Sequence, residues 1–186
     1  MPIELKHVFY TYGAGSTQEE KALEDLSCSI SDGEFVGIMG HTGCGKTTLI
    51  QLIAGLLSPT SGQVLLDGED INSKNYRRES LRKTVGLVFQ YPEYQLFEST
   101  VEKDVAFGLK HSGLNKEEKT ERVKEALSLM GFSYEKIRNI SPLSLSGGEK
   151  RRVAIAGVLV TKPRILIFDE PIAGMDPNGR ISFLNL

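Results

Sequence analysis

One eight-residue segment constrains the fold of this chain more than any other feature. It reads Gly40-His41-Thr42-Gly43-Cys44-Gly45-Lys46-Thr47 and fits the pattern G-x-x-x-x-G-K-[ST] at every position. Glycines let backbone N–H groups approach phosphate oxygens that a Cβ would hold off. Lys46 supplies a positive charge for β- and γ-phosphates, and the Thr47 hydroxyl is a ligand for Mg²⁺. The segment predicts a phosphate-binding loop, and Thr48 follows directly in the same site.

The residues on either side of this loop strengthen the prediction. Residues 34–39 are mostly apolar and predict a buried strand, and leucine and isoleucine recur at helical spacing from Leu49 to Leu57. A strand, a glycine loop and a helix in this order place a helix N-terminus, with its unpaired N–H groups, under an anion. The alternative is a glycine-rich turn in an ordinary α/β protein.

Composition excludes several classes of protein. The 186 residues include 40% hydrophobic and 25% charged residues, as in ordinary globular domains. A net charge of −2 gives no overall basic surplus for nucleic acid, and two cysteines are too few for a disulfide scaffold. The longest apolar stretch, Val153 to Val160, is too short to cross a membrane, and the N-terminus has no signal-peptide pattern. We expect a cytosolic chain that reaches a membrane only through a partner.

Hydrophobic periodicity suggests how the chain is organised. Strands are expected at 3–12, 22–30, 63–67 and 84–89, and a short helix at 77–83. Residues 98–140 contain no convincing strand but carry an amphipathic helix that Asn115 caps and Gly131 ends. We therefore expect an α/β core formed by 1–97 and 141–186, with 98–140 as a helical insertion.

Two carboxylates follow a second apolar run. Ile165 to Phe168 predicts a central parallel strand covered on both faces, and Asp169 and Glu170 come directly after it. Ligands of α/β sheets bind at the carboxyl ends of such strands. Asp169 could hold Mg²⁺ there, and Glu170 could polarise an attacking water. A strand that ends in a solvated acidic turn is the alternative.

A third segment reads Leu145-Ser146-Gly147-Gly148-Glu149. Ser146 and Glu149 fit a capping box, and the two glycines leave helix N-terminal amides uncovered for a second anion. Lys150, Arg151 and Arg152 add positive charge, although a solvated helix face explains them equally well. A helix cap with no further role is the alternative for the whole segment.

With these pieces in order, the chain resembles the ATPase subunit of ATP-binding cassette (ABC) transporters from about residue 3 to about residue 180. The resemblance also includes Gln90 and Ala173-Gly174-Met175-Asp176. It implies an α/β P-loop NTPase with an antiparallel β subdomain and an inserted α-helical subdomain. Residues 89–97, His41-Thr42-Gly43 and residues 151–157 are similar to energy-coupling-factor (ECF) importers, and to the second of their two ATPase subunits.

The resemblance implies roles for individual residues. ATP would bind through residues 40–48, with Tyr12 stacked on adenine, although an edge-strand tyrosine is the alternative for Tyr12. Ser146, Gly147 and Gly148 would contact ATP held by a second ATPase subunit, and Asp176 would lie across that interface. Mg²⁺ would be held by Thr47, Gln90 and Asp169. The catalytic residues would be Lys46, Gln90 and Glu170, with Glu170 as the base that activates water.

The resemblance also implies partners. In ECF importers, paired ATPase subunits on the cytoplasmic face of the membrane drive a coupling protein, here expected near Gln90 to Phe97. That protein carries a substrate-binding membrane subunit for vitamins or transition-metal ions. No nucleic acid partner is expected.

One family feature is absent from the sequence. The family's switch histidine lies on a strand after Asp176, whereas His7, His41 and His111 all precede Asp169 and the chain ends ten residues after Asp176. We expect a C-terminally truncated fold that binds ATP and hydrolyses it poorly by itself. The alternatives are a fragment that only binds nucleotide, and a soluble ABC ATPase that acts on nucleic acid or ribosomes.

Overall fold

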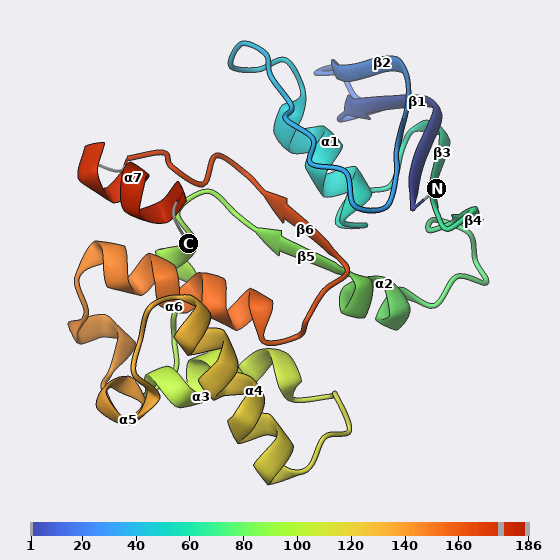
Figure 1. Cartoon of the computed structure of the whole chain (residues 1–186). Helices are drawn as coiled ribbons and strands as arrows, with labels where there is room; N and C mark the ends of the chain where they lie inside the picture. The colour runs from blue at the N-terminus through green and yellow to red at the C-terminus, as the bar shows by residue number, and fades with distance from the viewer. Residues whose placement is uncertain (1, 175–176, 185–186) are drawn as a thin grey trace. The chain divides into compact units, whose positions relative to one another are not determined.

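The computed structural model describes residues 2–174 and 177–184, and divides the chain into two compact units (Figure 1). The first unit comprises residues 1–82 and the second residues 83–186. Each unit has its own sheet, antiparallel in the first and parallel in the second. The predicted boundaries of the helical insertion at 98 and 140 remain a prediction.

The first unit is built on a four-stranded antiparallel sheet. Its strands are β1 (Ile3–Tyr12), β2 (Glu20–Ile30), β3 (Ser61–Leu66) and β4 (Glu69–Asp70), in the order β2-β1-β3-β4. The first three confirm the predicted strands, and in β1 the buried Ile3, Leu5 and Val8 keep to the core because the register shifts between Leu5 and Val8. β1 ends at Tyr12, which is one of the predicted site residues.

Helix α1 (Lys46–Ile53) follows the glycine loop, as predicted, but it is shorter than the apolar periodicity suggested. Its last turn is capped at Ala54, and Gly55 then adopts the left-handed conformation with φ 68°. A Cβ on Gly55 would lie 2.3 Å from Cδ2 of Leu81 in helix α2 (Arg78–Thr84). The positive φ favours glycine at this position, a Cβ would also displace the Leu81 side chain, and Leu56 is left exposed beyond the helix.

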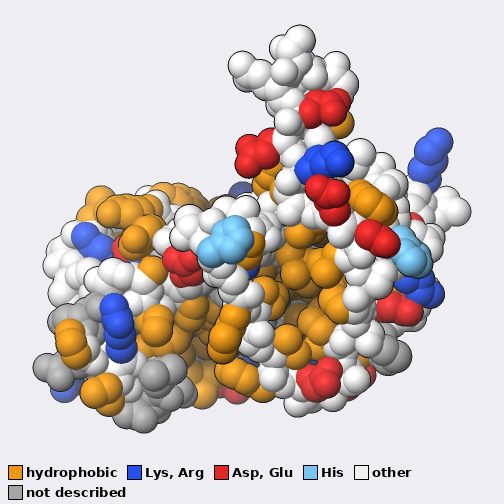
Figure 2. All heavy atoms as spheres, turned by 90° about the horizontal axis from the view of Figure 1, so that it is seen from above, with side chains coloured by type: hydrophobic (Ala, Val, Ile, Leu, Met, Phe, Trp, Pro, Cys, Tyr) orange, Lys and Arg blue, Asp and Glu red, His pale blue; other side chains and the backbone are white. Residues whose placement is uncertain are grey.

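The strand predicted at residues 34–39 is wrong for this structure. No strand is assigned to this segment, and Phe35, Val36, Ile38 and Met39 are exposed. In the space-filling view, hydrophobic side chains (orange) reach the surface in several places (Figure 2). An apolar run is buried as a strand only where neighbouring strands pair with it. Within the described residues, the parallel sheet contains β5 and β6 alone.

The second unit contains two parallel strands and a helical layer. β5 (Val85–Val88) pairs in register with β6 (Ile165–Phe168), so Val88 lies opposite Phe168. Both strands were predicted, but the expectation that β6 is covered on both faces is wrong. Leu166 is 37% exposed, because successive side chains point to opposite faces and the face that carries Leu166 is open.

Helix α6 (Gly147–Leu159) packs against β5 on one side and against α3 (Val101–Ala106) and α4 (Lys116–Leu129) on the other (Figure 1). The buried core of this unit joins β5 to helices α3, α4, α6 and α5 (Tyr134–Ile137), and includes Val88, Val105, Leu127, Tyr134 and Ile155. The cap predicted at Asn115 is present, as a capping box with Glu118, and Gly131 follows the end of α4 with φ 76°. The helices are α3 (Val101–Ala106), α4 (Lys116–Leu129), α5 (Tyr134–Ile137), α6 (Gly147–Leu159) and α7 (Pro177–Leu184), with short turns η1 (Pro92–Gln95), η2 (Phe107–Leu109) and η3 (Pro142–Ser144).

Among the described residues, no helix combines the length and the apolar character that a membrane crossing requires.

Candidate functional site

The glycine loop holds its own lysine through short-range contacts. The Lys46 ammonium group donates to the backbone carbonyls of Gly40 at 2.8 Å and His41 at 2.9 Å, and lies 3.9 Å from Sγ of Cys44. The Cys44 backbone N–H donates to the His41 carbonyl, and a ring nitrogen of His41 bonds to the Thr42 carbonyl. The loop is therefore a closed turn around a cationic group.

The geometry of this loop requires glycine at position 45. A Cβ on Gly40 would lie 2.4 Å from Sγ of Cys44, and a Cβ on Gly45 would lie 2.5 Å from the Ala22 carbonyl. Gly43 and Gly45 both have positive φ, at 84° and 89°. Gly45 accepts only glycine, because its φ is positive and the near atom belongs to the backbone, whereas the sulfur beside Gly40 belongs to a side chain that can move. Gly45 leads directly into the first turn of α1, where backbone N–H groups have no partner within the helix. This cradle, with one lysine on it, fits a phosphate group.

Tyr12 and Thr48 are joined by a hydrogen bond. The Tyr12 hydroxyl lies 3.0 Å from Oγ1 of Thr48, and the Tyr12 ring packs edge-on against Tyr10 with centroids 4.8 Å apart. Thr48 is buried in α1, whereas Tyr12 remains 40% exposed. The contact fixes an accessible aromatic ring beside the helix that follows the glycine loop.

Three predicted residues of the second unit lie together where β5 and β6 end. Nε2 of Gln90 donates to Oε2 of Glu170 at 3.0 Å, although 80 residues separate them in sequence. Asp169 is 8% exposed, and its backbone N–H donates to the Val88 carbonyl. Parallel pairing of the two strands explains this meeting, because Gln90 and Glu170 each lie two residues beyond paired positions Val88 and Phe168. We call Gln90, Asp169 and Glu170 the carboxylate cluster.

The predicted capping box at the start of α6 is confirmed. The Ser146 hydroxyl and backbone N–H donate to Oε2 of Glu149 at 2.7 and 2.9 Å, and the Glu149 backbone N–H returns a bond to the hydroxyl. The bond from the Ser146 hydroxyl, followed by that from its backbone N–H, lowers the pKa of the Glu149 carboxyl from its ordinary value. Gly147 and Gly148 have open space where a Cβ would stand, so their backbone is accessible.

Sequence reasoning missed the role of Arg151. It left open whether this residue adds positive charge for an anion or belongs to a solvated helix face. The structure buries Arg151 to 5% exposure and pairs it with Glu93 of η1. The partner is 58 residues away, and no local pattern links the two positions. Helical periodicity was the available signal, because Arg151 lies in the same α6 stripe as the buried Ile155.

The segment after Gln90 exposes aromatic side chains. Tyr94 and Phe97 are largely exposed, and Phe97 packs edge-on against Phe107 with centroids 4.9 Å apart. Single exposed apolar residues are ordinary, but an aromatic pair beside η1 presents a connected apolar surface.

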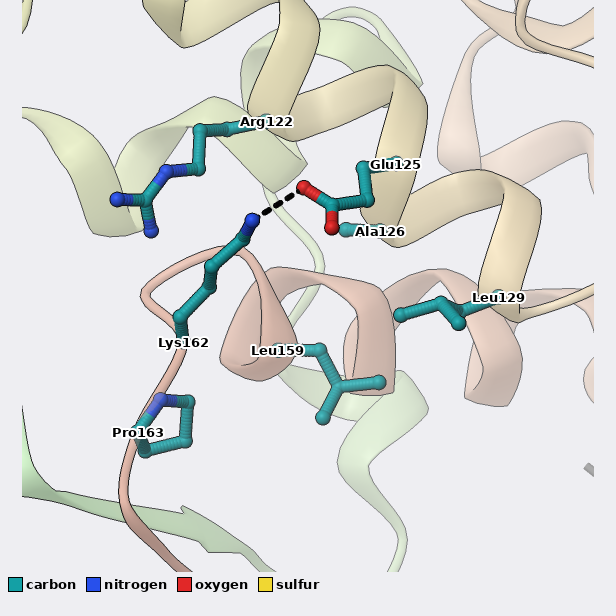
Figure 3. A pocket seen from close by; sticks show the side chains of 7 residues that line it. All are labelled: Arg122, Glu125, Ala126, Leu129, Leu159, Lys162 and Pro163. Atoms are coloured by element: carbon teal, nitrogen blue, oxygen red, sulfur yellow. Dashed lines mark ion pairs between the residues drawn. The ribbon is translucent and has the colours of Figure 1, made fainter.

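A cavity of about 260 Å³ lies between α4 and the end of α6 (Figure 3). Glu125 and Lys162 form an ion pair at its rim, and Arg122 points to the same side. Leu129, Leu159 and Pro163 supply apolar walls. None of its lining residues belongs to the predicted site.

The predicted residues therefore fall into two groups. Tyr12 and the loop from Gly40 to Thr48 belong to the first unit, and the carboxylate cluster and Ser146 to Gly148 belong to the second. Asp176 and Met175 lie outside the described residues. Within residues 2–174 and 177–184, no group of three histidine, cysteine, aspartate or glutamate side chains could hold a metal ion. The predicted Mg²⁺ ligands are not such a group, because Thr47 offers a hydroxyl, Gln90 an amide and Asp169 a carboxylate.

Comparison with known proteins decides the family. The sequence pattern of the ABC transporter family matches residues 23–173. This chain belongs to that family. It is 54% identical over 184 residues to the energy-coupling factor transporter ATP-binding protein EcfA2 of Clostridium acetobutylicum, covering 99% of this chain and 64% of that protein. EcfA2 of Caldanaerobacter subterraneus is also 54% identical, over 185 residues that cover 100% of this chain and 64% of that protein. The predicted resemblance to the second ECF ATPase subunit is confirmed.

Solved structures agree with the fold. CbiO1 from Clostridium perfringens, described as part of the ABC transporter complex cbiONQ, superposes with a TM-score of 0.85 at 39% identity, covering 98% of this chain and 70% of that one. The ABC cassette MJ0796, a dimer bound to ADP and Pi, gives 0.82 at 32% identity, with 98% and 80% covered. The predicted P-loop NTPase class is confirmed. The chain spans 64% of the length of the first two relatives named.

Proposed function

We propose that this chain is the ATP-binding and hydrolysing subunit of an ECF-type importer. The single observation that carries the proposal is the glycine loop, where the requirement for glycine at Gly45 and the bonds of Lys46 to the loop carbonyls match a phosphate cradle. The identity to EcfA2 proteins supports the choice of importer type.

Residues of the first unit bind the nucleotide in this proposal. The backbone amides of residues 40–48 bind the phosphates, and Lys46 turns from the loop carbonyls to the β- and γ-phosphates. Tyr12 stacks on adenine. The bond between Tyr12 and Thr48 supports that role, because it holds an exposed ring beside the same helix.

Hydrolysis in this proposal uses Thr47 of the first unit and the carboxylate cluster of the second. Thr47 of the loop, Gln90 and Asp169 provide hydroxyl, amide and carboxylate oxygens, which suit Mg²⁺. When bound, Mg²⁺ would neutralise part of the negative charge on the phosphate oxygens. Glu170 accepts a proton from the attacking water, and its bond to Gln90 sets the direction of its carboxylate. Phosphoryl transfer needs positioning and charge stabilisation more than covalent chemistry, so this small set is sufficient.

A second ATPase subunit completes each site. The open backbone at Gly147 and Gly148, at the N-terminus of α6, supports contact with ATP held by that subunit. Asp176 is proposed at the same interface. The membrane coupling protein is proposed to bind near Gln90 to Phe97, where Tyr94 and Phe97 are exposed. The chain then works at the cytoplasmic face of the membrane, and vitamins or transition-metal ions are the transported solutes. A role on nucleic acid or ribosomes is not favoured, because the relatives are transporter proteins and the net charge is −2.

ATP-dependent pairing of the chain tests this function. We expect Glu170→Gln to retain ATP and therefore to accumulate a dimer in Mg-ATP, because closure over the γ-phosphate persists when hydrolysis is slow. Sedimentation velocity with Mg-ATP, Mg-ADP and no nucleotide measures the dimer fraction, and Lys46→Ala is the matched control that should stay monomeric. A Glu170→Gln chain that binds no Mg-ATP would contradict the proposal. A chain that binds Mg-ATP without pairing would leave the alternative of a nucleotide-binding protein.

A further inference from the structure

Arg151 connects two segments that flank the carboxylate cluster. Its Nε and Nη2 donate to the two oxygens of Glu93 at 3.0 and 3.1 Å, which makes a bidentate ion pair with η1. Its Nη1 donates to the backbone carbonyls of Pro171 at 3.3 Å and Ala173 at 2.9 Å. The guanidinium also lies 5.7 Å from the centroid of the Tyr91 ring. Four donor bonds of one buried side chain thus hold the segment after Gln90 and the segment after Glu170.

Two residues beside these segments, Tyr91 and Glu170, have a strained backbone conformation. Tyr91 has φ 55° and Glu170 has φ 46°, a left-handed conformation that costs non-glycine residues about 1–2 kcal/mol. Such conformations persist only where the surroundings hold them in place. The bonds of Arg151 to Glu93 and to the carbonyls at 171 and 173 begin within three residues of the strained positions.

The contacts form a closed ring. Gln90 binds Glu170 directly on one side, and Arg151 joins Glu93 to Pro171 and Ala173 on the other. The Tyr91 ring also lies against Gly174, because a Cβ there would be 3.3 Å from the ring. A displacement of η1 cannot leave the Glu170 segment in place without breaking bonds at Arg151.

We propose that Arg151 is a positioning residue that sets the orientation of Glu170 and makes it depend on the position of η1. The residue touches neither nucleotide nor water in this scheme, and acts through the backbone of residues 171–174. The importance of Glu170 rests on the proposed function, whereas the mechanical link between the two segments does not. Because η1 carries the exposed Tyr94, a protein bound on that surface would move Glu170 through Arg151.

Lysine cannot replace this arginine. An ammonium group has three donors on a flexible stem and no planar fork, so it cannot bond both Glu93 oxygens and two carbonyls at once. Arg151→Lys therefore keeps the charge and removes the connection. Glu93→Gln leaves the carbonyl bonds of Arg151 intact and weakens only the contact with η1.

Hydrogen exchange on the purified chain tests the connection without any nucleotide. In the native fold the Ala173 N–H donates to the Glu170 carbonyl, and the Tyr94 N–H donates to the Tyr91 carbonyl. We expect Arg151→Lys to speed exchange of both amides about tenfold or more, with little change at buried amides of α4. Glu93→Gln should speed exchange at Tyr94 more than at Ala173. Arg138→Lys, whose guanidinium lies over Tyr134 in the same unit, is the matched control and should change neither amide.

Hydrolysis provides the second readout. Single-turnover hydrolysis of bound ATP should slow about 10- to 100-fold in Arg151→Lys, whereas its ATP affinity should stay within about twofold of that of the wild type. Unchanged exchange at Ala173 and Tyr94 in folded Arg151→Lys would overturn the proposal, and so would a uniform increase across the whole chain. A wild-type chain that shows no ATP binding would defeat the proposed function, whereas the exchange data would still decide the role of Arg151.

Discussion

The glycine loop and the carboxylate cluster are held together in different ways. The bonds that shape the loop join residues at most six positions apart, such as Lys46 to Gly40. In the cluster, Gln90 meets Glu170 across 80 residues, and Arg151 reaches partners 58 and 22 residues away. The hydrogen bonds of the loop are therefore local, and its closest distant neighbour is the Ala22 carbonyl beside Gly45. A cluster built from three segments depends on how each one packs, so changes at a distance can alter it.

The largest change in stability and in ATP affinity is expected from a single methyl group added to the loop. Gly45→Ala places a Cβ 2.5 Å from the Ala22 carbonyl at a residue with φ 89°. We expect the free energy of unfolding of the chain to fall by about 3 kcal/mol and ATP affinity to be lost. Urea unfolding and equilibrium ATP binding measure the two effects.

Gly33→Ala is the matched control for that change. Gly33 also has a positive φ, at 74°, but has open space where the Cβ would stand. Its cost should be limited to backbone strain of about 1 kcal/mol, with ATP affinity unchanged. Equal costs at Gly33 and Gly45 would show that the close approach to Ala22 does not shape the loop.

The smallest change in the free energy of unfolding is expected from Glu149→Gln at the start of α6. The capping box there is local, although it lies close in sequence to Arg151 and its long-range contacts. Because the pKa of Glu149 is lowered in the folded chain, its contribution to stability is present above the unfolded pKa of about 4.3 and is lost as pH falls through the folded value. Glu149→Gln should therefore lower the free energy of unfolding by less than about 1 kcal/mol at neutral pH.

Urea unfolding from pH 7 down to pH 3 measures this difference. We expect the gap between wild type and Glu149→Gln to narrow as the pH falls below 4, while hydrogen exchange at Ala173 stays the same in both chains. A gap that is constant with pH would contradict the role given to the Glu149 carboxylate, and altered exchange at Ala173 would show that the cap is not local.

Local patterns in the sequence were the most predictive. The caps at Asn115 and Ser146 and the two separate strands that end at Val88 and Phe168 follow from patterns within a few residues, and all are present. The contact between Gln90 and Glu170 was not predicted, because it depends on the parallel pairing of two strands from distant parts of the chain.

Features that depend on distant neighbours were not predictable in this way. The burial of Arg151 depends on Glu93, which lies 58 residues away in the sequence. Residues 34–39 have the composition of a buried strand but are exposed, because apolar character does not specify which strands are available to pair. In each case the missing information is the identity of a neighbour from another segment.

The central claim is that the glycine loop binds ATP and that the carboxylate cluster hydrolyses it. The most direct measurement compares Mg-ATP affinity and single-turnover hydrolysis for wild type, Lys46→Ala and Glu170→Gln. We predict that Lys46→Ala weakens binding by about 100-fold, and that Glu170→Gln binds like wild type but hydrolyses at least about 100-fold more slowly. Binding unaffected by Lys46→Ala, or hydrolysis at the wild-type rate in Glu170→Gln, would contradict the account.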